Sequence, residues 1–138
     1  MDNNIINKLL ETAKESANSN FCCKYSKFTV GTALLTKDGK VYKGFNIEND
    51  GIQSICGERV AFVKALSEQN KEFKAIAVVG KPLSATKFIK TTPCGYCRQF
   101  MNEYASDDFK IYTYDEEQEK LYEYTIDDLL PEDFKDEY

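Results

Sequence analysis

The sequence predicts an α/β domain in which helices pack on a sheet. Segments whose apolar residues recur every three or four positions alternate along the chain with short apolar runs bounded by turn residues. The chain has 138 residues, a length that suits one domain with its own core. Because no repeat, linker or low-complexity segment divides the sequence, we expect a single layered domain over residues 1–138.

The first third of the chain predicts one helix followed by a hairpin. Residues 3–18 place apolar side chains at helical spacing and end in a polar run, which indicates an amphipathic helix. Residues 29–36 and 41–47 predict two strands. The Asp38-Gly39 pair between them is a strong hairpin signal.

The rest of the chain predicts two helices and three more strands. Residues 56–68 and 94–105 are expected to be helical, with Pro before the second segment. Strands are expected at 73–79, which is apolar enough to be buried, at 109–114 and at 121–126. The expected apolar positions of the helix 56–68 are Val60, Ala61, Val63, Ala65 and Leu66.

The charge balance argues against a nucleic-acid substrate. Lys and Arg number 18 against 23 Asp and Glu, the net charge is −5, and no basic block occurs. No apolar run approaches the roughly 20 residues that span a bilayer, and the N-terminus lacks the basic start of a secretory signal. We therefore expect a cytoplasmic protein that acts on a small neutral molecule and has neither nucleic acid nor a membrane as a partner.

The chain contains five cysteines and no histidine. In a reducing compartment, clustered cysteines bind metals or do chemistry more often than they form disulfides. The absence of histidine excludes a Ser-His or Cys-His catalytic pair and any histidine ligand to zinc. Proton transfer must then depend on Glu, Asp, Lys, Tyr, Cys or a metal-activated water.

Three of the cysteines lie at the starts of the two predicted helices after the hairpin. Cys56 opens one helix, and Cys94 and Cys97, preceded by Pro93, open the other. A strand and a crossover between them would bring the two helix starts side by side. Three protein ligands that leave one position for water form the catalytic zinc pattern. We expect one Zn²⁺ per chain, bound by Cys56, Cys94 and Cys97.

Two charged residues follow the first of these cysteines. Glu58 can face the pocket without reaching the metal and is the best-placed general acid and base. Because three thiolates exceed the charge of Zn²⁺ by one, we expect Arg59 to hydrogen-bond one or two of the sulfurs. Other interpretations remain open at this point: a redox dithiol, half of a structural zinc site, and a surface ion pair for Arg59.

At these residues the sequence resembles the cytidine deaminase family, of the small type with three zinc-binding cysteines. The C-x-E and P-C-x-x-C segments match the deaminase signature. Further matching motifs occur in order along nearly the whole chain: YSKF with VG at residues 25–31, NIEN at 46–49, PCGYCRQ at 93–99, and LLP with a following Phe at 129–134.

The resemblance implies a three-layer α/β/α fold, with a mixed sheet of about five strands flanked by helices. It implies that Cys56, Cys94 and Cys97 bind zinc and that Glu58 shuttles protons. The implied reaction is the hydrolytic deamination of cytidine and 2′-deoxycytidine to uridine and 2′-deoxyuridine with release of ammonia, a step of pyrimidine salvage.

The same resemblance implies how a nucleoside substrate is bound. Asn46 and Glu48 would hydrogen-bond the sugar hydroxyls, and as alternate residues of an extended segment they point to the same side. Phe28 would pack on the pyrimidine or the sugar. Phe134 would reach the pocket of a neighbouring subunit, since family members of this length resemble homotetramers with shared active sites.

The chain also departs from the family pattern. Gly57 stands where Ala is usual, Thr29 stands where Pro is usual, and the loop 50–55 is shorter and lacks the usual aromatic residue. Cys22 and Cys23 are expected to be small core residues. Two alternative functions stay open: a deaminase of another cytosine compound such as blasticidin S, and a non-enzymatic zinc or thiol-redox module.

Overall fold

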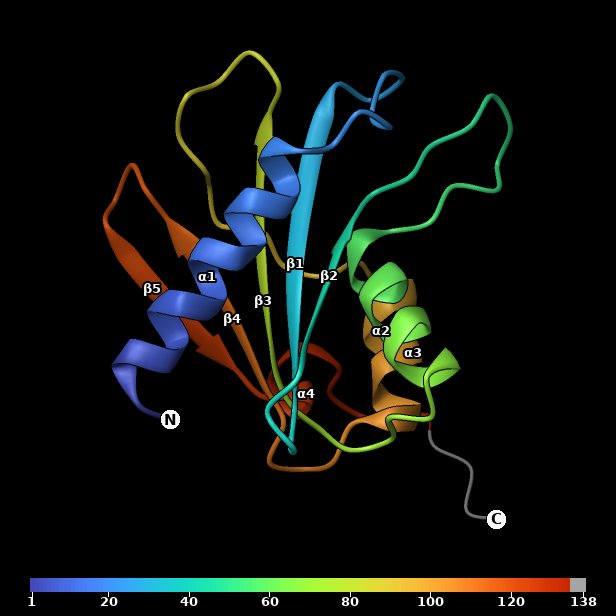
Figure 1. Ribbon diagram of the computed structural model, residues 1–138, viewed down its shortest axis with the longest axis vertical. Coiled ribbons are helices and arrows are strands. Elements are labelled where there is room, and N and C mark those ends of the chain that lie inside the picture. The colour runs from blue at the N-terminus through green and yellow to red at the C-terminus, as the bar shows by residue number, and fades with distance from the viewer. Residues whose placement is uncertain (135–138) are drawn as a thin grey trace.

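The computed structural model, which describes residues 1–134, contains one five-stranded mixed sheet (Figure 1). The strand order is β2-β1-β3-β4-β5. The β3 and β4 strands run parallel, and the other neighbours are antiparallel. The strands are β1 (Phe28–Thr36), β2 (Val41–Phe45), β3 (Phe73–Pro82), β4 (Lys110–Asp115) and β5 (Lys120–Tyr124).

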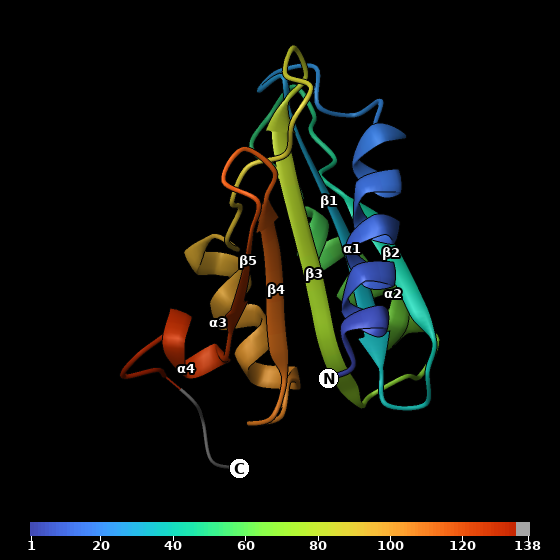
Figure 2. The same ribbon diagram turned by 90° about the vertical axis from the view of Figure 1, so that its left-hand side faces the viewer.

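Helices cover both faces of this sheet. The α1 helix (Asn3–Asn18) packs on one face, and α2 (Gly57–Ser67) and α3 (Gly95–Tyr104) pack on the other. Figure 2 shows α1 and α3 on opposite sides of the central strands. A short α4 (Ile126–Leu129) follows β5. The predicted three-layer α/β/α architecture is thus confirmed. Within residues 1–134, no helix is long and apolar enough to cross a membrane.

The core consists of two apolar clusters separated by the sheet. Because side chains of a strand alternate between its faces, Ile76 and Val78 of β3 point to the α2 and α3 side, whereas Ala77 and Val79 point to α1. All four side chains are fully buried. A strand that is covered on both faces has a continuous apolar sequence, which explains why residues 73–79 have no polar alternation.

Glycines allow two helices to lie very close to the sheet. A Cβ atom on Gly31 would lie 2.1 Å from the carbonyl oxygen of Ala13 in α1. A Cβ on Gly44 would lie 2.5 Å from the carbonyl oxygen of Gly57, the first residue of α2. The buried hydroxyl of Thr32 donates to the same Gly57 oxygen at 2.9 Å. Contacts with β1 and β2 therefore fix the start of α2.

Gly57 itself is packed tightly. A Cβ at this position would lie 3.2 Å from the Cα of Phe45 and from a methyl carbon of Thr32. These distances are shorter than ordinary van der Waals contacts between carbon atoms. The glycine that replaces the usual alanine thus permits this close approach of α2 to β2.

The strand ends differ from those expected. The second predicted strand, 41–47, stops at Phe45, because beyond it only the bridge between Ile47 and Ile55 continues the pairing. The third, 73–79, extends to Pro82, because Phe28 and the residues after it pair with its far end. The last, 121–126, ends at Tyr124, where α4 begins with its own capping box.

The inward face of α2 also differs in detail from the expectation. Val63, expected to be apolar and inward, is exposed, and Phe62 is fully buried. Phe62 contacts Phe73 of β3 and Phe100 of α3, with ring centroids 4.7 Å and 6.2 Å apart. The arrival of α3 beside α2 therefore decides which side of the helix is buried.

We predict that Gly31→Ala destabilises the protein by about 1–3 kcal/mol, because the added methyl group must displace the α1 backbone. Urea unfolding followed by circular dichroism measures this. Gly95→Ala is the matched control, since a Cβ there meets nothing within 4 Å. Equal stability of the two variants would show that α1 moves away from the sheet at no cost.

Candidate active site

Three cysteine sulfurs from two helix starts meet at one point. Cys56 is the N-cap of α2 and Cys94 is the N-cap of α3, where its sulfur accepts the N–H of Cys97 at 3.4 Å. The sulfur of Cys94 lies 3.8 Å from that of Cys56 and 3.5 Å from that of Cys97. All three sulfurs lie within 4.8 Å of one another. Unpaired N–H groups at the helix starts favour negative charge there.

These distances fit a zinc ion. With Zn–S bonds of about 2.3 Å, tetrahedral geometry places sulfurs about 3.8 Å apart. Thiolates are also the soft ligands that select zinc. The neighbouring thiol of Cys97 and the guanidinium group of Arg59 lower the pKa of Cys56 to about 5. The interaction with Cys56, together with burial, raises the pKa of Cys97. A divalent cation at this point relieves the repulsion that opposes ionisation of all three thiols.

Glu58 is a buried carboxyl group next to the sulfurs. It is 3 % exposed, and its Oε1 atom has no hydrogen-bond partner within residues 1–134. Burial, and then the nearby negative charge of Cys56, raises the pKa of Glu58 to about 7. A carboxyl group of this kind can both give and take a proton near neutral pH.

A cavity of about 240 Å³ brings these groups together with two residues that the sequence pattern assigns to sugar binding. Cys56, Glu58 and Cys94 line it together with Asn46 and Glu48. The remaining lining residues are Val30, Ser54, Ile55, Gly57, Thr91 and Thr92. An acid–base group, cysteine sulfurs and polar side chains therefore line one cavity that is large enough for a small molecule.

Glu48 is fixed by donors from the loop before β1. Its carboxylate accepts the hydroxyl of Ser26 at 2.5 Å and the backbone N–H groups of Tyr25 and Ser26 at 3.1 Å and 3.0 Å. Burial alone would raise the pKa of Glu48, but the hydrogen bonds from Ser26 and Tyr25 bring the pKa below its usual value. Glu48 is therefore an oriented, ionised acceptor.

The amide of Asn46 is bound to the neighbouring β1 strand. Its Oδ1 accepts the N–H of Val30 at 2.9 Å and the side-chain N–H of Asn20 at 2.7 Å. Its Nδ2 donates to the carbonyl oxygen of Phe28 at 2.9 Å and lies 3.4 Å from Glu48. Because the backbone of β1 supplies both a donor and an acceptor, only one orientation of this amide is satisfied.

Arg59 lies against the sulfurs and under an aromatic ring. Its Nη2 donates to the Cys56 sulfur at 3.6 Å, the kind of contact that the charge balance predicts. The guanidinium carbon lies 4.3 Å from the ring centroid of Tyr96 in α3. Tyr96 was not among the residues predicted from the sequence.

The two phenylalanines assigned to substrate contacts lie outside the cavity lining. Phe28 is half-buried at the start of β1, and its ring packs over Gly80 of β3. Phe134 is 74 % exposed. Its backbone oxygen accepts the side-chain N–H of Gln99 at 2.8 Å, so the C-terminal segment rests on α3. Within the described chain, the structure does not bring either ring to Glu58.

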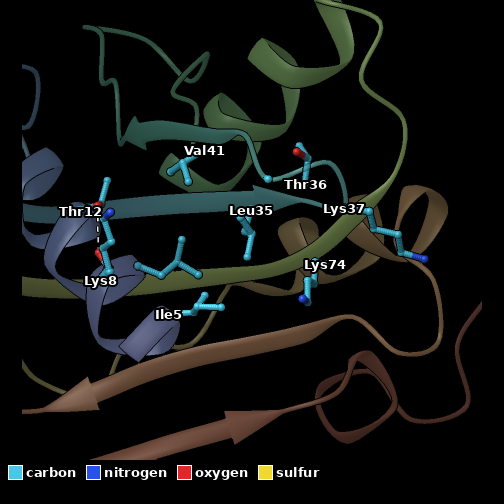
Figure 3. A pocket seen from close by; sticks show the side chains of 10 residues that line it. Ile5, Lys8, Thr12, Leu35, Thr36, Lys37, Val41 and Lys74 are labelled. Carbon is cyan, nitrogen blue, oxygen red and sulfur yellow. Dashed lines mark hydrogen bonds between the residues drawn. The ribbon is translucent and has the colours of Figure 1, made fainter. Parts of the chain in front are cut away.

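A larger cavity lies elsewhere and lacks reactive groups. It has a volume of about 330 Å³ and lies between α1 and the turn that joins β1 to β2. In Figure 3, Ile5, Leu35 and Val41 surround it, while the chains of Lys37 and Lys74 extend in different directions. No thiol or carboxyl group lines this cavity. The smaller cavity beside Glu58 is therefore the candidate active site.

Comparison with known proteins identifies the family of the chain. The model of the cytidine and deoxycytidylate deaminase zinc-binding region matches residues 3–113. The chain belongs to this family. A cytidine deaminase of Sporosarcina psychrophila is 37 % identical over 133 residues, which cover 96 % of this chain and 93 % of that protein.

Two further relatives of this deaminase-family chain bear on its fold and specificity. The crystal structure of a cytidine deaminase from Burkholderia pseudomallei superposes with a TM-score of 0.80 at 36 % identity and covers 93 % of this chain and 98 % of its own. A blasticidin-S deaminase of Bacillus cereus is 34 % identical over 110 residues, which cover 77 % of this chain and 76 % of that protein. The family is a zinc-binding one, and the three-cysteine cluster of this chain suits a single zinc ion.

We predict that Cys56→Ala lowers the zinc content from about one ion per chain to almost none, because two thiolates and water bind zinc poorly. Metal analysis of the purified protein measures this. Cys22→Ala is the control, since Cys22 is a half-buried free thiol outside the cluster. Full zinc content in the Cys56 variant would contradict the ligand assignment.

Proposed function

We propose that the protein catalyses the hydrolytic deamination of cytidine and 2′-deoxycytidine to uridine and 2′-deoxyuridine, and that it serves pyrimidine salvage. The observation that carries this proposal is the buried carboxyl group of Glu58, whose Oε1 has no hydrogen-bond partner within residues 1–134, beside three convergent thiols of which two line the same cavity. Membership of a deaminase family supports the reaction type. The full-length similarity to a cytidine deaminase supports the substrate.

In the proposed reaction Glu58 moves two protons. Zinc bound by the three cysteines supplies a Lewis acid that makes a water molecule acidic. Glu58 accepts a proton from the attacking water and gives it to ring nitrogen N3, which makes C4 electrophilic. Once the water oxygen has bonded to C4, Glu58 takes the proton that remains on this oxygen and carries it to the exocyclic amine. The C4–N bond then breaks, and ammonia leaves.

The cavity supports a nucleoside better than a free base. Glu48 is an oriented carboxylate whose weakest partner is the Asn46 amide at 3.4 Å, and a sugar hydroxyl can replace that contact as a donor to Oε2. The amide of Asn46, which both β1 and Asn20 engage, fixes the wall on which Glu48 lies. In this proposal Glu48 makes the stronger sugar contact and Asn46 sets its geometry.

The proposal includes an assembly of four chains that share active sites. Phe134 supports it, because an exposed aromatic ring on an anchored backbone is a typical interface residue. In this assembly Phe134 enters the pocket of a neighbour, and Phe28 packs beside the nucleoside. Sedimentation velocity measures the number of chains. We also propose a cytoplasmic location, which the free cysteines favour.

We predict that Glu58→Gln keeps the zinc but lowers turnover of cytidine by about 10²–10⁴-fold, since an amide cannot carry the protons. The loss of cytidine absorbance and the metal content measure the two effects. Glu68→Gln, at the exposed C-terminal end of the same helix, is the matched control. Near-normal turnover in the Glu58 variant would overturn the mechanism, and zinc without any turnover in the wild type would favour a non-enzymatic zinc module.

We predict that Glu48→Gln raises the KM for cytidine about tenfold or more, because a charged acceptor of hydroxyl groups is lost. Free cytosine, which has no sugar, should be affected much less. The assay compares cytidine, 2′-deoxycytidine, cytosine and blasticidin S, with Glu68→Gln as the control. Faster turnover of blasticidin S than of cytidine by the wild type would replace the proposed substrate.

A further inference from the structure

An aromatic ring and a guanidinium group join the two helices that present the sulfurs. Arg59 lies in the first turn of α2, and Tyr96 lies in the first turn of α3 between Cys94 and Cys97. The guanidinium carbon is 4.3 Å from the centroid of the Tyr96 ring. A cation this close to the face of a ring makes a cation–π contact. One turn further along, Phe62 of α2 and Phe100 of α3 are also in contact.

The guanidinium group of Arg59, on which the Tyr96 ring stacks, makes few hydrogen bonds. The hydrogen bond of Arg59 from Nη2 to the Cys56 sulfur is long, at 3.6 Å. The buried Nε of Arg59 has no partner within residues 1–134. A flexible side chain with so little hydrogen bonding needs packing to keep its head group in one place. Tyr96 is 68 % exposed, so burial in the core does not explain the position of its ring.

We propose that Tyr96 is a positioning residue, which stacks on Arg59 and keeps the guanidinium group against the Cys56 sulfur so that the metal is retained. This inference rests on the proposed zinc site. Three thiolates exceed the charge of Zn²⁺ by one, and a fixed cation beside them offsets that excess. Removal of the ring face would let Arg59 turn into solvent and leave the net negative charge of the zinc–thiolate group without its counter-charge, which destabilises the metal-bound state.

The test measures zinc release from the zinc-loaded protein to a chromogenic chelator. Tyr96→Leu should release zinc about three- to tenfold faster than the wild type, the range of a partly desolvated cation–π contact. Tyr96→Phe keeps the ring face and should release zinc at the wild-type rate. Tyr104→Leu, a half-exposed tyrosine at the other end of α3, is the control for loss of an aromatic residue from this helix.

A double-mutant cycle ties the effect to Arg59. In an Arg59→Leu background, Tyr96→Leu should add no further increase in the release rate, because the partner of the ring is already absent. Equal release from Tyr96→Leu and the wild type, or full additivity with Arg59→Leu, would overturn the inference. Circular dichroism of each variant verifies folding.

The experiment separates this inference from the proposed function. A wild-type protein that binds no zinc would refute the proposed metal site itself. A wild-type protein that binds zinc and deaminates cytidine, but whose release rate does not depend on the Tyr96 ring, would refute only the role of Tyr96. Faster release from Tyr96→Phe as well as Tyr96→Leu would assign the effect to the hydroxyl group and also contradict the stacking argument.

Discussion

Three sulfur atoms from two helices must lie within about 4 Å of their neighbours, and much of the surrounding structure follows from this demand. One helix start must be fixed against the sheet, which Gly44, Gly57 and the Thr32 hydroxyl achieve by close approach. The other must come beside it, which the buried contact between Phe62 and Phe100 secures. The apolar layer and the polar site therefore share the same two helices.

The two carboxyl groups that line the cavity lie in different surroundings, which shift their pKa values in opposite directions. Beside the sulfurs, the Oε1 atom of Glu58 has no hydrogen-bond partner among residues 1–134, and burial raises the pKa of Glu58 to about 7. Elsewhere in the same cavity lining, several donors surround Glu48, and its pKa is lowered. In the proposed function these two carboxyl groups would have different tasks, since Glu58 would exchange protons and Glu48 would stay ionised to accept hydroxyl groups.

The sequence predicted much of the layout because its signals are local. Apolar periodicity and turn residues indicated the five strands and the main helices, and cysteines at helix starts indicated the metal cluster. Features that depend on distant segments escaped prediction. The choice of Phe62 over Val63 as the inward residue depends on where α3 arrives. The hydrogen bonds of the Asn46 amide come from β1 and from Asn20, just after α1. The contact of Tyr96 with Arg59 joins the starts of two different helices.

The order of the elements along the chain also bears on how the site forms during folding. Cys94 and Cys97 are near neighbours in sequence, but Cys56 precedes them by a segment that contains β3, the central strand of the sheet. The approach of the two helix starts therefore needs the non-local pairing of β3 with β1 and β4. The complete set of three sulfurs is thus a product of tertiary folding, and no local segment of the chain can form it alone.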